Sequence, residues 1–197
     1  MLPELGQAAL LLALVAALLQ ALLPLAGAAG GRASWMAVAR PAAYAQLALL
    51  LFAYAVLTLA FVQQDFSVKY VADNSNSLLP MVYRFTAVWG AHEGSMLLWV
   101  LMLAVWNAAV ALWSRRLPEV VMARVLGVIG LVAIGFLSFL AFTSNPFLRL
   151  LPAPLEGHDL NPLLQDPGMI VHPPMLYVGY IGFVVPFAFA IAALLEG

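Results

Sequence analysis

The sequence predicts an all-α, polytopic integral membrane protein, a bundle of about five transmembrane helices. Hydrophobic residues make up 65% of the 197-residue chain and charged residues only 9%, whereas soluble domains contain about 25% charged residues. Five uncharged apolar runs each approach or exceed the ~18–20 residues that a helix needs to cross the hydrocarbon core. The runs show no alternation of apolar and polar residues, which excludes the strands of a membrane barrel.

The five apolar runs cover residues 6–28, 44–62, 96–113, 125–142 and 175–195. Small residues at 26–31 resemble the cleavage site of a signal peptide. The amino end, however, carries Glu4 and no basic residue, and the run is longer than a signal peptide requires. We therefore expect the first run to be a retained helix.

Basic residues set the expected orientation. One set of loops is rich in arginine and holds a single carboxylate: Arg32, Arg40, Arg115, Arg116, Arg124 and Glu119. The opposite set combines fewer basic with more acidic residues: Lys69, Arg84, Arg149, Asp65, Asp73, Glu93, Glu156, Asp159 and Asp166. The positive-inside rule makes the first side cytoplasmic, so the amino terminus is periplasmic. The net charge of −1 gives no electrostatic basis for nucleic-acid binding.

Two polar connections should then form outer loops, at residues 63–94 and 144–174. The second loop contains seven of the chain's thirteen prolines, which is too many for a long helix. It also contains seven leucines and Phe147. We therefore expect it to lie packed on the outer surface of the membrane.

His172 is the strongest candidate for a functional residue. It lies between the proline-rich loop and the last apolar run, and Pro173 and Pro174 follow it directly. A neutral imidazole is a good ligand for haem iron, and the two prolines should stiffen the backbone and start a helix. The alternative is that His172 is an ordinary solvated or hydrogen-bonded histidine at the membrane interface.

A second polar segment, residues 89–99, should mark the start of the third helix. His92 and Glu93 there either form a polar helix start or, together with Trp89, contact a cofactor or substrate.

Tryptophans recur every seven residues along this helix, which predicts a packing seam or a lipid-facing stripe: Trp99, Trp106 and Trp113. The chain has no cysteine and carries no recognisable catalytic motif. His158, beside Asp159, is a weaker metal-ligand candidate.

Four segments resemble the System I cytochrome c haem lyase family (CcmF): residues 89–100, 142–147, 159–168 and 172–180. The resemblance covers nearly the whole of residues 1–197 and matches the amino-terminal portion of the family. It implies a bacterial inner-membrane protein that receives haem b from the chaperone CcmE and attaches it to apocytochrome c through thioethers at a CxxCH site. Maturation proteins of the CcmH and CcmI types are the other implied partners. Paralogues dedicated to nitrite-reductase cytochromes are not excluded.

The resemblance assigns His172 to the first of two outward histidines that ligate the incoming haem, as an axial ligand of the iron. Trp89 and His92 are implied only as minor contacts, and no catalytic residue is assigned. The chain lacks the family's tryptophan-rich haem-binding segment, the second outward histidine and the two transmembrane histidines that hold a resident b-type haem. We therefore expect it to be part of a longer protein and inactive alone.

Two other classes stay open at this point. The first is a membrane haem-transfer or chaperone-binding subunit that works with a separate chain and has no ligase activity of its own. The second is a transporter or channel module, which would place ionisable residues in mid-helix. The apolar runs contain no such residues.

Overall fold

The computed structural model describes residues 1–197 as an all-helical chain. Five spans are long and apolar enough to cross a membrane, which confirms the predicted number. They are α1 (Leu2–Gly30), α3 (Ala39–Gln63) with the short α2 (Ala33–Met36) before it, α6 (His92–Trp113), α7 (Glu119–Phe142), and α8 (Pro167–Gly182) continued by α9 (Val184–Glu196).

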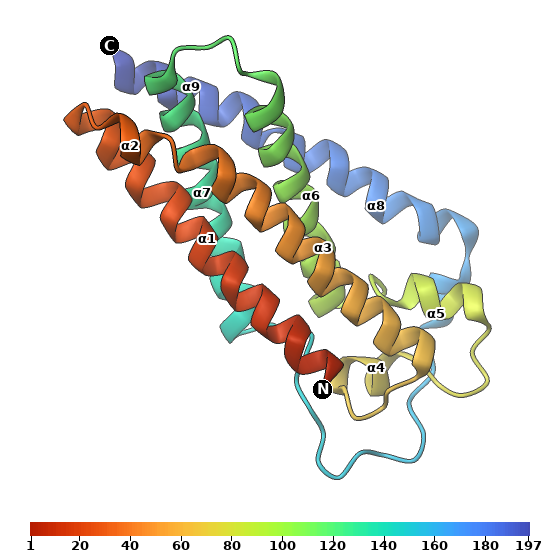
Figure 1. The fold of residues 1–197 in the computed structure, drawn as a ribbon. Helices are drawn as coiled ribbons and strands as arrows, with labels where there is room; N and C mark the ends of the chain where they lie inside the picture. The colour runs from red at the N-terminus through yellow and green to blue at the C-terminus, as the bar shows by residue number, and fades with distance from the viewer.

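The spans form a bundle in which α1 packs mainly on α3 and α7, while α8 and α9 run along α6 and α7 (Figure 1). The two chain termini lie at opposite ends of the bundle. One end, here the long-loop end, gathers α4 (Lys69–Asn74), α5 (Met81–Ala87) and the connection at residues 143–166. The other, the short-loop end, holds the turns at residues 31–38 and 114–118. The membrane side that each end faces stays a prediction.

Small residues bring α1 and α7 close together. Alanines at every fourth position of α1 are at most 4% exposed: Ala9, Ala13, Ala17 and Ala21. A Cβ on Gly130 of α7 would lie 3.0 Å from the backbone nitrogen of Ala21. Such spacing of small residues is typical of closely packed membrane helices. A Cβ on Gly135, by contrast, would have no neighbour within 4 Å, so this glycine does not serve close helix packing here.

Three amide side chains meet in the interior of the bundle, where the sequence suggested only apolar packing. The Gln20 amide nitrogen donates to Asn107 Oδ1 at 2.9 Å and to the Leu126 carbonyl at 2.7 Å. The Gln20 oxygen accepts from Gln46 and, at 2.9 Å, from Asn107. All three side chains are at most 1% exposed. The cluster therefore joins α1, α3, α6 and α7 by polar contacts.

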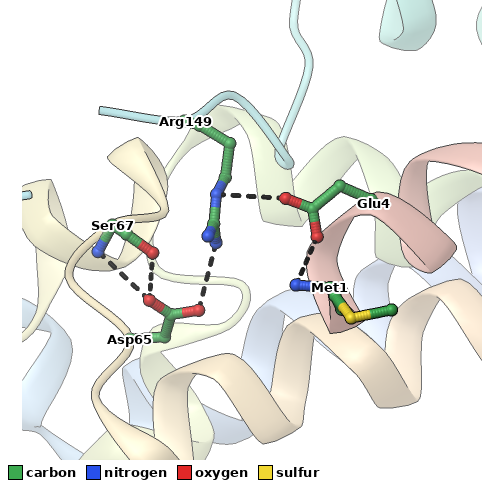
Figure 2. Close-up of polar contacts among 5 residues, drawn as sticks. All are labelled: Met1, Glu4, Asp65, Ser67 and Arg149. Carbon is green, nitrogen blue, oxygen red and sulfur yellow. Dashed lines mark hydrogen bonds and ion pairs between the residues drawn. The ribbon is translucent and has the colours of Figure 1, made fainter. Parts of the chain in front are cut away.

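The connection at residues 143–166 is fastened to the bundle at its first half. Leu150 donates its backbone N–H to Ser67 O, and Lys69 donates to Leu148 O, both at 2.8 Å. The Arg149 guanidinium contacts Asp65 at 3.1 Å and Glu4 at 3.3 Å (Figure 2). The connection is thus anchored beside the amino end of α1.

The apolar residues of this connection divide into two groups. Phe147 and Leu160 are buried, with 5% and 1% exposed. Leu151, Leu155 and Leu163 are 87%, 102% and 72% exposed. The connection is therefore packed against the bundle at some positions and exposed at others, and its contact with the membrane surface stays a prediction.

Candidate functional site around His172

The helix that carries His172 begins earlier than the sequence analysis placed it. α8 starts at Pro167, and the Asp166 carboxylate caps it by accepting from the backbone N–H of Gly168 at 2.8 Å and of Met169 at 3.3 Å. Proline fits the first helical position because no intrahelical acceptor is available to an N–H there. The predicted outer loop at 144–174 is therefore too long at its end, and Pro173 and Pro174 lie inside the helix rather than at its start.

His172 lies in the second turn of α8, at the long-loop end, and its side chain is exposed. The face that it shares at helical spacing is apolar and open: Leu176 is 50% exposed, Phe183 is 72% exposed, and nothing lies within 4 Å of a Cβ placed on Gly179. The opposite face of α8 meets the bundle through Tyr177 and Ile181. The imidazole therefore points away from the rest of the chain.

His92 has close protein partners and His158 lies near one carboxylate, whereas the His172 side chain has no partner. His92 Nδ1 lies 2.7 Å from Ser144 Oγ, and its ring meets Phe139 edge-on at 5.8 Å. His158 is 83% exposed and lies 4.0 Å from Asp73, not against its sequence neighbour Asp159, which accepts from Asn76. The geometry of His92 favours the polar helix start over a contact with a cofactor.

Trp89 contacts the helix of His172 directly. Its indole N–H donates to the Ile170 carbonyl at 3.2 Å, two residues before the histidine. The backbone around Trp89 is itself fixed, because Ser95 Oγ donates to the Trp89 carbonyl at 2.7 Å. The structure therefore places Trp89 against the helix turn that carries His172, although the two residues are far apart in sequence.

Tyr70 in α4 organises the turn that holds Trp89, a role that the sequence analysis missed. Its hydroxyl lies 3.1 Å from the Val88 carbonyl and accepts from the Ala91 N–H at 3.1 Å. Burial raises the pKa of the Tyr70 phenol, so the hydroxyl stays protonated and can donate. A Cβ on Gly94 would lie 2.6 Å from this hydroxyl and would overlap the Val88 carbonyl, so only glycine fits there.

Trp99 and Trp106 of α6 contact neighbouring helices, as the packing interpretation predicts. The Trp106 indole N–H donates to the Val178 carbonyl at 2.9 Å. Trp99 lies against Phe136 of α7 with ring centroids 4.0 Å apart. Trp113 is 78% exposed at the short-loop end. Two of the three indoles therefore serve helix packing.

The side chains around His172 fit one kind of metal site. The chain gathers no group of three or more His, Cys, Asp or Glu side chains that could hold a metal ion. A single imidazole is too small a donor set for a bare structural ion, which takes about four ligands. It fits an iron whose equatorial ligands come from a porphyrin, and the open apolar face beside His172 has room for such a flat, largely hydrophobic group.

The chain is similar to several known cytochrome c-type biogenesis proteins. CcmF, a cytochrome c-type biogenesis protein of Pseudomonas aeruginosa, is 64% identical over the whole chain, and its Escherichia coli counterpart is 57% identical. NrfE of Haemophilus influenzae, also a cytochrome c-type biogenesis protein, is 45% identical over 99% of the chain. The chain spans only about 30% of the length of these relatives.

A solved structure of the cytochrome c haem lyase CcmF superposes on all of this chain and on 31% of its own length, with a TM-score of 0.84 and 27% identity. The sequence pattern of the family described as cytochrome C assembly protein matches residues 89–196, more than half of the chain and all of the segment that holds Trp89, His92 and His172. The chain therefore belongs to the cytochrome c assembly protein family and corresponds to the amino-terminal portion of CcmF.

Proposed function

We propose that this chain forms the part of a cytochrome c haem lyase that presents substrate haem to apocytochrome c, with His172 as an axial ligand of the haem iron. The observation that carries the proposal is the exposed imidazole on an open apolar helix face, without a protein partner. The membership of the CcmF family supports it. Trp89 and His92 then lie near the site and support the protein structure around it.

The role of His172 is to hold haem while the reaction takes place. Each cysteine thiol of apocytochrome c adds across a haem vinyl group, so that a sulfur–carbon bond forms and a proton is added to the neighbouring vinyl carbon. No oxidant is consumed in this addition. The protein contributes by fixing the position of the haem relative to the incoming thiols, which replaces an encounter in solution by a reaction between oriented groups.

The site should face the periplasm of a bacterial inner membrane. Five arginines occur at or near the short-loop end, at positions 32, 40, 115, 116 and 124. The positive-inside rule makes this end cytoplasmic and the long-loop end periplasmic. His172 is then accessible to the haem chaperone CcmE, to apocytochrome c and to maturation proteins of the CcmH and CcmI types.

Replacement of the imidazole tests this proposal. His172→Ala, introduced into the chromosomal gene so that the protein is made in its native form, should abolish holocytochrome c formation. The protein itself should accumulate normally in the membrane, because the side chain packs against nothing. Covalent haem on cytochrome c would be measured by haem staining of membrane and periplasmic fractions. His158→Ala is the matched control, since it removes another exposed imidazole from the same end and should leave the yield unchanged.

The ligand assignment is wrong if the His172→Ala strain makes normal amounts of holocytochrome c. A loss that accompanies a fall in the amount of membrane-inserted protein would instead assign His172 a structural role. A loss in the His158→Ala strain as well would show that the assay reports on charge or polarity of the long-loop end and not on one ligand.

A further inference from the structure

We infer that Trp89 is a positioning residue for His172, because its indole N–H takes the place of a backbone N–H that Pro174 lacks. The consequence for haem attachment rests on the proposed function of His172. The placement of α8 by Trp89 is a property of the fold and can be measured separately.

Two consecutive prolines leave a gap in the hydrogen bonding of α8. In an α-helix the N–H of each residue donates to the carbonyl four residues earlier. Pro173 and Pro174 have no N–H, so the carbonyls of Met169 and Ile170 lack their helical donors. A buried or membrane-facing carbonyl without a donor is unfavourable. The Trp89 indole, at 3.2 Å from the Ile170 oxygen, supplies a donor from outside the helix.

The donor comes from a rigid part of the bundle. The backbone next to Trp89 is fixed on both sides through the Tyr70 hydroxyl, which contacts the carbonyls of Val88 and Ala91, and Tyr70 is only 3% exposed. Such a support lets the indole act as a fixed point and not as a mobile surface side chain.

Within residues 1–197, which span about 30% of the length of the relatives, α8 has few other contacts that set its position. Only 17% of the span formed by α8 and α9 is buried, against 39–56% for the other four spans. A second indole hydrogen bond, from Trp106 to the Val178 carbonyl at 2.9 Å, lies about 12 Å further along the helix. Two contacts at different positions along α8 define both the tilt of this helix in the bundle and its rotation about its own axis. Since Ile170 and His172 are two residues apart, fixing that carbonyl fixes the direction of the imidazole.

The test is a cycle of two substitutions in the chromosomal gene. Trp89→Phe keeps an aromatic ring and removes the N–H. Pro174→Ala restores the backbone N–H that bonds to the Ile170 carbonyl, so in this background the indole donor is no longer needed. Trp113→Phe is the control, since Trp113 is 78% exposed and donates no hydrogen bond in the structure.

Two quantities would be measured in each variant. The first is the distance distribution between spin labels on cysteines placed at Val82 of α5 and Met175 of α8, which are 66% and 69% exposed. The second is the yield of holocytochrome c. Trp89→Phe should broaden the distribution and lower the yield about fivefold, the equilibrium effect of one neutral hydrogen bond. The Trp89→Phe/Pro174→Ala variant should restore both, and Trp113→Phe should change neither.

An unchanged distance distribution in Trp89→Phe would overturn the inference, as would a double variant no better than Trp89→Phe alone. The result is distinguishable from a failure of the proposed function. If His172→Ala supports normal holocytochrome formation while Trp89→Phe still broadens the distribution and Pro174→Ala rescues it, the ligand assignment falls and the placement of α8 by Trp89 stands.

Discussion

Replacement of Gln20 by leucine should destabilise the bundle more than any other change of a single polar side chain within the spans. Gln20 is fully buried and takes part in four hydrogen bonds with groups on three other helices. Hydrogen bonds between membrane helices contribute about 0.6 kcal/mol each on average. Gln20→Leu should therefore lower the free energy of unfolding by about 2–3 kcal/mol. Leucine is close to glutamine in size, so no cavity adds to this value.

The loss would be measured by titrating the purified protein in mixed micelles with a denaturing detergent and following helix content. Gln7→Leu is the matched control, because Gln7 lies on the same helix and its side-chain oxygen is buried without a hydrogen-bond partner. The same substitution there removes an unsatisfied group, so it should be neutral or slightly stabilising.

A triple variant examines the reason for the loss. Much of the effect of Gln20→Leu should come from the amides of Gln46 and Asn107, which keep their polarity in an apolar interior after their partner is removed. Changing all three residues to leucine removes these unsatisfied groups and should recover part of the stability. Equal effects of Gln20→Leu and Gln7→Leu, or a triple variant that loses three times as much as the single one, would refute this reasoning.

Two further predictions concern the long-loop end. Gly94→Ala should disrupt the turn at Trp89, since its Cβ would overlap the Val88 carbonyl, and should reduce thermal stability in detergent; Gly135→Ala, where nothing lies within 4 Å, is the control and should be neutral or stabilising. Hydrogen bonds from Ser77 lower the pKa of Glu156 below its ordinary value of 4.5. The stabilisation that these bonds provide is therefore complete above pH 4.5 and is lost as the pH falls through the lower pKa of Glu156 in the folded protein. The protection factor of the Ser77 amide, which is the exchange rate of an unstructured amide at the same pH divided by that of Ser77, should therefore fall only on acidification below about pH 4.5. Glu156→Gln should remove this pH dependence, and a fall that begins near neutral pH would contradict the assignment.

The five spans were predictable because the hydrophobic signal for a membrane helix is local. Each run is long enough and apolar enough by itself, so no knowledge of its neighbours is needed. The predicted start of α8 was too late because a proline can start a helix or lie inside one, and Pro173 and Pro174 lie inside α8, whereas the Asp166–Pro167 pair starts it. That pair is a local helix-start signal, with a capping carboxylate and a proline at the first helical position.

The amide cluster and the contact of Trp89 with Ile170 could not be predicted in the same way. Gln20, Gln46 and Asn107 are isolated polar residues in three separate runs, and averaging over a hydropathy window hides them. Their pairing depends on the rotation of each helix about its axis, which follows from packing among α1, α3, α6 and α7. The proline pair shows that two carbonyls of α8 need donors from elsewhere, but not which residue supplies them.

The chain therefore combines two kinds of helix support. The four spans from α1 to α7 are held by close packing of small residues and by a buried amide cluster. The fifth span, which carries the imidazole, is less buried within residues 1–197 and is joined to α6 and to the turn before α6 by two indole hydrogen bonds. On the proposed function, His172 needs an open face to bind haem, and an open face provides no packing for α8. The two indole hydrogen bonds, from Trp89 and Trp106, can hold α8 without covering that face.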